Sequence, residues 1–170
     1  MRSGAALAIL AALSACSKSS APAPEQPLQV IEGFTVSQAD HGSRLWTMEG
    51  ASAVLAEDAK QVAAVSPRLK FFKGGRQVTE VTSGSGVLRT DTNDVRLSSA
   101  VVVRSLDEDS VLKTDELLWD SKKNKYVTDQ EVTITRPEGV LHGKGLEASS
   151  DLGEIKIHHQ TSVIEKGARP

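Results

Sequence analysis

Apolar and polar residues alternate with a period of two along much of this chain. The clearest case is Asp115–Thr135, DELLWDSKKNKYVTDQEVTIT, where Leu117 and Trp119 point to the same side of an extended segment. After a short polar interruption, a second extended run ends with Val132 and Ile134, again two positions apart. Alternation on both sides of a polar turn predicts a β-hairpin with one dry face and one solvated face.

Similar short extended segments precede and follow this hairpin, separated by turn residues such as those of Gly84–Gly86 and Pro137–Gly139. Short strands at near-regular spacing, without helices between them, are typical of antiparallel sandwiches, rolls and barrels. The Ala-rich stretch Gly50–Val65 fits either a helix or two strands that meet near Glu57 and Asp58, and we favour the two strands. The predicted fold class is all-β and antiparallel.

Residues 1–15 are predicted to be a lipoprotein signal peptide and not part of the fold. Arg2 gives a positive start, and Ala5–Leu13 is an apolar run too short to span a bilayer as a mature helix. Small residues then precede Cys16, which resembles the lipobox of bacterial lipoproteins and implies cleavage before Cys16 and a lipid on its sulfur. The alternative is an ordinary secretory signal or an uncleaved anchor.

Residues 16–32 are predicted to be a tether, because Ser, Ala and Pro without apolar periodicity cannot bury enough surface to fold. We expect the folded domain at 33–164 and a short tail at 165–170. The net charge of −2 lacks the basic stripe that nucleic acid requires, so no nucleic-acid partner is expected. A single cysteine excludes an internal disulfide.

Three groups of residues occur in a characteristic order along the chain. They are Trp46 with Met48, Gly50 and Ala53; Thr114–Asp120 with Lys125–Asp129 and Val132–Ile134; and Gly143–Ala148 with Asp151 and Leu152. In this order they resemble the LptC family, a periplasmic subunit of the bacterial lipopolysaccharide exporter, over about residues 34–164. Each motif alone is common, and the ordered set is more specific.

The resemblance implies an incomplete β-jelly roll, in which two facing sheets, open at the ends, surround an apolar trough for lipid A acyl chains. Such a subunit receives lipopolysaccharide from the inner-membrane ABC transporter and passes it to an LptA-type bridge towards the outer membrane. The implied partners are LptF/LptG-type membrane subunits with their ATPase, and the LptA-type bridge. The chain itself is expected to be no enzyme and to need no cofactor.

One feature departs from the family, which commonly carries an uncleaved transmembrane helix where this chain has a predicted lipid anchor. Either device holds a periplasmic domain at the inner membrane. Ser17 follows the cysteine, which leaves sorting to the outer membrane open. An outer-membrane lipoprotein that acts as an assembly or pilot factor is therefore the alternative function.

Strand alternation selects the residues that point between the two sheets. If the sheets stay apart, these residues line the trough; the plain alternative is that they form an ordinary dry sandwich core. The predicted trough residues are Trp46, Met48, Leu69, Phe71, Val101, Val103, Leu117, Trp119, Val132, Ile134, Ile155 and Ile157. A second surface is the unpaired edge of a terminal strand, where a partner strand is expected to dock against Ile155, Lys156, Ile157 and His158.

The four histidines do not form a metal motif. His158 and His159 are adjacent, so on a strand they face opposite sides, and His41 and His142 stand alone. No nucleophile motif such as G-x-S-x-G occurs. We expect neither a metal site nor catalysis; a jelly-roll metalloenzyme is the third and weakest alternative.

Overall fold

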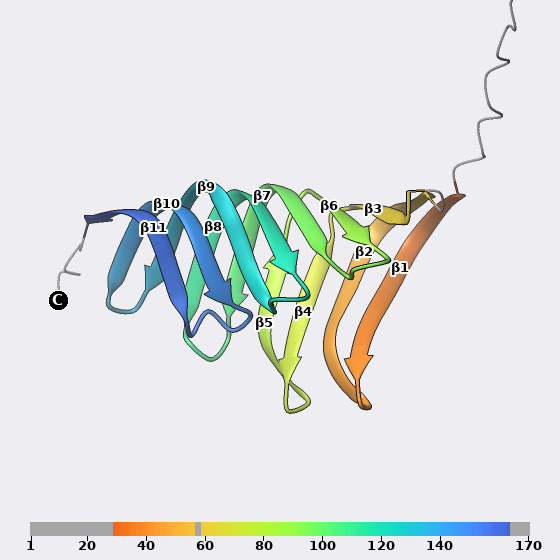
Figure 1. Ribbon diagram of the computed structural model, residues 1–170, viewed down its shortest axis with the longest axis horizontal. Helices are drawn as coiled ribbons and strands as arrows, with labels where there is room; N and C mark the ends of the chain where they lie inside the picture. Colours follow the sequence, from red (N-terminus) through yellow and green to blue (C-terminus); the bar gives the residue numbers. More distant parts are fainter. Residues whose placement is uncertain (1–28, 57–58, 164–170) are drawn as a thin grey trace, which may run out of the picture.

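The computed structural model describes residues 29–56 and 59–163, and every regular element in these ranges is a β-strand (Figure 1). The strands are β1 (Gln29–Asp40), β2 (Ser43–Ala56), β3 (Gln61–Val65), β4 (Arg68–Lys73), β5 (Arg76–Thr82), β6 (Ser85–Arg89), β7 (Val95–Ser105), β8 (Ser110–Asp120), β9 (Lys125–Arg136), β10 (Gly139–Ser149) and β11 (Ile155–Val163). The all-β prediction is confirmed. No helix among these residues is long and apolar enough to cross a membrane.

All strand pairs are antiparallel and belong to one hydrogen-bonded sheet in the order β11-β10-β9-β8-β7-β5-β4-β2-β3-β6, with β1 added to β2. This sheet is folded into two facing layers because its long strands bend. In β7, Val95–Ser98 pair with β6, whereas Val102–Ser105 pair with β5. In β2, Trp46–Glu49 pair with β4, whereas Ser52–Ala56 pair with β3. The fold is thus the predicted jelly-roll type, with two facing layers.

We name the layers by the strands that lie wholly in one of them. The first layer contains β4 and β5 with the strand halves that continue from them, and the second layer contains β3 and β6 with theirs. The remaining strands, β1, β2 and β7 to β11, contribute one half to each layer in the same way.

The bends lie along one side of the molecule, which we call the seam. Ser66, Ser99, Ala100 and Gly145 have positive φ there, between +48° and +74°, a region that residues with a side chain adopt rarely. Backbone hydrogen bonds run across neighbouring bends, from Ser66 N to Gly84 O (2.9 Å) and from Gly84 N to Ser99 O (2.8 Å). The layers are therefore joined continuously at the seam, and the strained backbone is held by paired backbone groups.

The opposite side carries the turns of both layers and is called the mouth. The β1–β2, β4–β5, β7–β8 and β9–β10 turns belong to the first layer, and the β2–β3, β6–β7, β8–β9 and β10–β11 turns to the second. The central hairpin is confirmed: β8 and β9 pair, and Asn124 ends their turn with φ +56°. The Ala-rich stretch forms two strands, as predicted.

The core lies between the layers and follows the period-two pattern. Trp46, Met48, Leu69 and Phe71 come from the first layer and face residues such as Trp119 from the second. Each fully buried side chain of this size stabilises the fold by about 1.5–3 kcal/mol. Because both layers contribute large apolar side chains, burial itself holds the layers together.

The ends of the sheet are its first and last strands, which lie at opposite ends of the molecule in Figure 1. The strand β1 begins at Gln29, inside the segment predicted as a tether. The predicted signal peptide, Cys16 and the tail lie outside the described residues.

Candidate functional site

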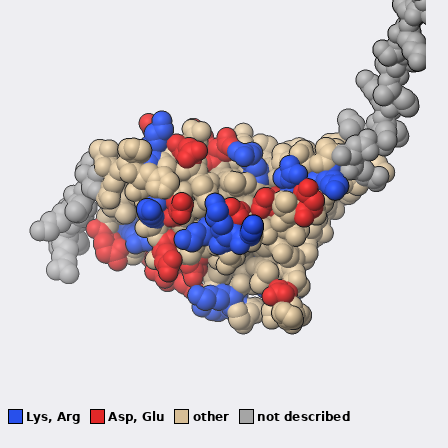
Figure 2. Space-filling model, in the orientation of Figure 1, with Lys and Arg blue, Asp and Glu red and all other residues tan. Residues whose placement is uncertain are grey.

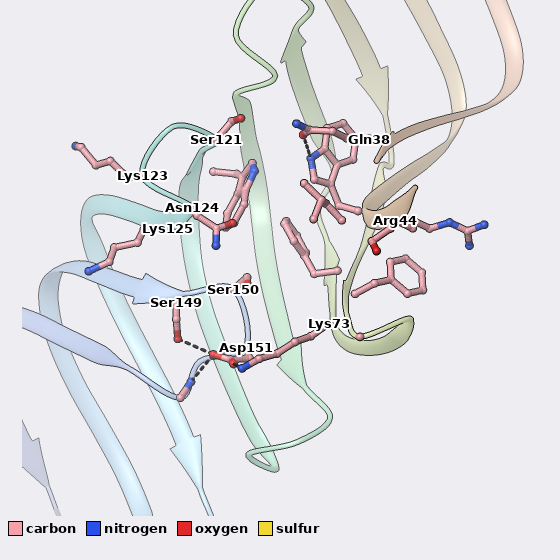
Figure 3. A pocket seen from close by; sticks show the side chains of 18 of the residues that line it. Gln38, Arg44, Lys73, Ser121, Lys123, Asn124, Lys125, Ser149, Ser150 and Asp151 are labelled. Atoms are coloured by element: carbon pink, nitrogen blue, oxygen red, sulfur yellow. Dashed lines mark hydrogen bonds and ion pairs between the residues drawn. The ribbon is translucent and has the colours of Figure 1, made fainter. Parts of the chain in front are cut away.

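A cavity of about 650 Å³ opens at the mouth, between the turns of the two layers. One side is formed by the start of β2 and the β4–β5 turn, and the other by the β8–β9 and β10–β11 turns. In Figure 3, Lys123, Asn124 and Lys125 from the β8–β9 turn lie across the opening from Arg44 and Lys73 of the first layer. Core residues of both layers, Trp46, Phe71 and Trp119, form part of its lining, so it leads towards the space between the layers.

Aromatic rings line the inner end of this cavity. Trp46 and Phe71 of the first layer and Trp119 of the second all contribute to its wall. Phe71 packs edge-on against Trp119, with ring centroids 4.5 Å apart, and against Tyr126 at 5.5 Å. Trp119 and Tyr126 contact each other at 5.2 Å. This ring cluster joins the layers and gives the cavity an apolar inner wall, which suits hydrocarbon better than a polar solute.

Cationic side chains stand at the outer end of the cavity. Lys123 is paired with Asp120 at 3.3 Å, and the Arg44 guanidinium lies over the Phe72 ring at 5.3 Å. Lys125 has no carboxylate within ion-pair distance in the described part of the chain. Figure 2 shows Lys and Arg side chains across the middle of the face in view, interspersed with Asp and Glu. Four cationic side chains line the cavity against two carboxylates, Asp151 and Glu154, so the rim is cationic on balance. An apolar inner wall with such a rim matches an amphiphile that carries an anionic head group.

The β10–β11 turn, residues 150–154, closes the mouth beside the cavity. It belongs to the second layer, yet its backbone carbonyls accept hydrogen bonds from first-layer side chains. Thr79 Oγ1 donates to Ser150 O (2.6 Å), Ser105 Oγ to Asp151 O (2.6 Å) and Arg136 Nη2 to Leu152 O (3.0 Å). Leu152 is fully buried in the core although its φ is +60°. The turn therefore acts as a strap between the layers, and we call it the strap.

Asp151 connects the strap to the cationic rim. Its carboxylate accepts hydrogen bonds from Ser149 Oγ (2.6 Å) and Gly153 N (3.1 Å) and pairs with Lys73 Nζ (3.2 Å), as Figure 3 shows. These contacts, the Ser149 hydroxyl most of all, hold the pKa of Asp151 below its ordinary value against the opposing effect of partial burial. The carboxylate is thus charged at neutral pH, and it ties the strap to the β4–β5 turn.

Three buried polar side-chain atoms in the described ranges have no hydrogen-bond partner: Trp119 Nε1, Tyr126 Oη and Arg136 Nε. A buried polar group without a partner destabilises a fold by about 1–3 kcal/mol, so few are retained without reason. Arg136 uses another nitrogen to hold the strap. The other two belong to the ring cluster, and Trp119 lines the cavity.

The sequence of the whole domain matches one family. The family described as "Lipopolysaccharide-assembly, LptC-related" covers residues 4–165 of the 170. The chain belongs to the LptC family. The resemblance seen in the ordered motifs is therefore confirmed.

One solved structure similar to this LptC-family chain is LptH, titled as the LptA homologous periplasmic component of the conserved lipopolysaccharide transport device from Pseudomonas aeruginosa. The two share 13% identity with a TM-score of 0.49, over 86% of this chain and 92% of that one. No curated protein sequence matches the chain. Identity at this level does not transfer function, so the family match alone carries the assignment.

The predicted trough residues of the LptC-family domain all point between the layers. Ten of them are almost completely buried in one core cluster, and Ile155 and Ile157 pack against it from β11. Only Trp46, Phe71 and Trp119 also line the cavity. The structure thus brings the twelve residues together, and their contact with lipid stays a prediction.

The residues of the predicted docking edge lie in the last strand of the sheet. Ile155, Lys156, Ile157 and His158 open β11, which pairs with β10 on one side only. At the opposite end of the sheet, β1 also has one partner, and it exposes Val30 and Ile31. Among the described residues, no strand pairs with the outer edge of β1 or of Ile155–His158, so backbone groups there are available for strand addition. Docking itself stays a prediction.

Sequence reasoning missed the strap and the two unpartnered donors. Lys125 and Tyr126 belong to the recognised hairpin motif, but only the packing of the two layers places Lys125 at the cavity and Tyr126 against Phe71. Thr79, Ser105 and Arg136 are far apart in sequence and meet only at the strap. Among the described residues, no three His, Cys, Asp or Glu side chains are grouped as metal ligands.

Proposed function

We propose that this LptC-family chain is a periplasmic lipopolysaccharide transport protein that acts by binding and not by catalysis. It receives lipopolysaccharide from the inner-membrane ABC transporter and passes it to an LptA-type bridge. The observation that carries the proposal is the cavity at the mouth, whose aromatic inner wall continues into an apolar interlayer core and whose rim is cationic. Acyl chains would lie between the layers and the phosphorylated sugars at the rim.

The energetics favour capture at such a site. Burial of hydrocarbon contributes about 25 cal/mol per Å², so even a partly inserted acyl chain is held. Lys125 and the neighbouring Lys123 supply charge for the head-group phosphates at the rim. A transport protein must also release its cargo, and a mouth that opens to solvent along one side permits lateral exit.

The two strand edges fit transfer along a row of similar domains. The β1 edge would face the LptF/LptG-type membrane subunits and the β11 edge an LptA-type bridge. Strand addition at either edge would extend both layers at once, because β1 and β11 each pair along a bent partner. The apolar space between the layers would then continue from one protein into the next.

Attachment to the inner membrane through a lipid on Cys16 is part of the proposal. Two or more acyl chains anchor a protein stably, since each buried methylene contributes about 0.8 kcal/mol. Density-gradient separation of the membranes distinguishes this location from the outer membrane, where the alternative assembly-factor role would place the protein. Mass spectrometry of the mature N-terminus tests the lipid directly.

A photo-crosslinking amino acid tests the transport role. Placed at Trp119 or Val132, it should capture lipopolysaccharide when the chain is reconstituted with the transporter and ATP. Lys113 is the control position, because it is exposed on the outer face of β8. Absence of adducts from every inward position, with an active transporter, would reject the proposed function.

A further inference from the structure

The buried polar side chains of this core are otherwise well paired. Thr79, Ser110, Thr114 and Thr128 each donate a hydrogen bond to a backbone carbonyl. The indole nitrogen of Trp46, in the same cavity wall as Trp119, donates to Gln38 Oε1 at 2.5 Å. Against this background, the unpartnered donors of Trp119 and Tyr126 stand out, because the third such atom, Arg136 Nε, belongs to a side chain that already donates through Nη2 to Leu152 O.

The register of the β8–β9 hairpin makes the residues that carry the two donors neighbours. Trp119 and Tyr126 are directly opposite each other on β8 and β9, and their rings are in edge contact. Trp119 is 3% exposed and lines the cavity, and Tyr126 lies deeper at 0% exposed. Burial, together with the nearby carboxylate of Asp151 on the strap, raises the pKa of Tyr126, so its hydroxyl keeps its proton. Both groups therefore present a proton to an acceptor.

The surroundings restrict the chemistry of that acceptor. The rings around the donors are apolar, and the cations lie further out at the rim. A charged phosphate would remain at the rim, because it is costly to bury without a cation. A neutral carbonyl oxygen attached to a hydrocarbon chain can enter, with its chain in the core and its oxygen on the donors. Esters and amides of fatty acids are the molecules that combine these parts.

We propose that Trp119 Nε1 and Tyr126 Oη are hydrogen-bond donors for the ester or amide carbonyl oxygens at the head of a bound acyl chain. This inference rests on the proposed function and adds a specificity to it: the site distinguishes acylated from alkylated lipids. Access of the carbonyl to Tyr126 requires displacement of the strap, whose Asp151 lies on that side. Trp119 meets the ligand first, since it already borders the cavity.

The test compares two water-soluble, short-chain amphiphiles of equal chain length. One is a phosphatidic acid with ester-linked chains, and the other is its ether-linked analogue, which lacks the carbonyl oxygens. Isothermal titration calorimetry on the full chain gives the ratio of the two dissociation constants for each variant. Comparing this ratio between variants cancels the difference in solubility between the two amphiphiles.

The wild-type chain should bind the ester more tightly than the ether, by about three- to tenfold for each hydrogen bond made. Tyr126→Phe removes only the hydroxyl and should lower this preference by about threefold or more, without lowering the thermal midpoint of the free protein. Trp119→Phe should lower it similarly. Trp46→Phe is the matched control, because it loses the same ring volume from the same cavity wall but its donor is already engaged with Gln38.

Equal binding of ester and ether by the wild-type chain, or an unchanged preference in Tyr126→Phe and Trp119→Phe, would overturn the donor assignment and leave the transport role intact. Failure of lipopolysaccharide and both amphiphiles to bind would instead reject the proposed function, and the donor assignment with it. Loss of preference in Trp46→Phe as well would show that ring volume, and not the donor, sets the ratio, which also contradicts the assignment.

Discussion

The two halves of the mouth differ in how the layers meet. In the open half, between the β1–β2 and β4–β5 turns of the first layer and the β8–β9 turn of the second, the layers stand apart and leave the cavity. In the closed half, the strap crosses from the second layer to Thr79, Ser105 and Arg136 of the first. Both halves have the same alternating strands and the same buried core. The difference therefore comes from the turns: one buried leucine and a few side-chain donors decide whether the mouth is open or closed.

Removal of the buried strap side chain should have the largest effect on this difference. Leu152→Ala deletes a fully buried side chain from the closed half, and we expect a loss of about 2–5 kcal/mol in the free energy of unfolding. Urea denaturation measures it. Leu106→Ala, in the neighbouring β7–β8 turn, is the control, because Leu106 is 52% exposed and its loss should change stability by under about 0.5 kcal/mol. Equal effects of the two changes would show that the strap does not hold the layers.

A single hydrogen bond to the strap should matter less. Thr79→Val keeps the shape of a fully buried residue but removes the donor to Ser150 O, so we expect a loss of about 1–2 kcal/mol. Hydrogen exchange should speed up in residues 149–154 first. Ser85→Ala removes an exposed, 3.4 Å hydrogen bond at the seam and should leave that exchange unchanged. Faster exchange throughout the sheet, without a local effect, would argue against a separate strap.

Reversing the positive charges at the rim of the cavity tests the open half of the mouth. Lys123→Glu together with Lys125→Glu should weaken lipopolysaccharide binding by about fivefold at low salt, since exposed charge contacts are worth about 0.2–1 kcal/mol each. The difference should shrink as salt is added, because exposed charges are screened. Lys113→Glu makes the same kind of change on the outer face of β8 and should leave affinity unaltered. Equal weakening by Lys113→Glu would indicate a non-specific charge effect.

The smallest expected effect is a pH dependence of the strap. The pKa of Asp151 is lowered in the folded state, so its contacts stabilise the strap above the ordinary aspartate pKa and are lost as pH falls through the lowered value. The protection of residues 149–154 against hydrogen exchange should therefore fall below about pH 4. Asp151→Asn should reduce this fall. If the variant keeps the full acid response, other carboxylates cause it.

The sequence was sufficient for the fold because the periodic signal is local. The β8–β9 hairpin, its Asn124 turn and the inward position of Trp119 all follow from period-two alternation and turn chemistry. The bends were not predictable in this way. Ser99 and Ala100 adopt positive φ because neighbouring bends bond to one another across the seam, which no local propensity indicates.

The candidate site was only half accessible to sequence reasoning. Alternation identified Trp46, Phe71 and Trp119, but it did not distinguish cavity walls from packed core, because both have the same pattern. The strap determines which of these residues border the cavity and which are packed in the core. It depends on contacts such as the hydrogen bond from Ser105 Oγ to Asp151 O, which joins residues 46 positions apart in the sequence. Lipidation of Cys16 stays a prediction, since that residue lies outside the described ranges.

The central claim is that acyl chains enter between the layers through the mouth, and a distance across the mouth tests it most directly. Spin labels on click-reactive residues at Ser43, in the first layer, and Lys122, in the second, leave Cys16 unmodified. With saturating lipopolysaccharide, their distance should lengthen, while a pair within the first layer, Ser43 and Arg104, should stay constant. An unchanged Ser43–Lys122 distance with lipopolysaccharide bound would place the lipid on the outer surface and contradict the account.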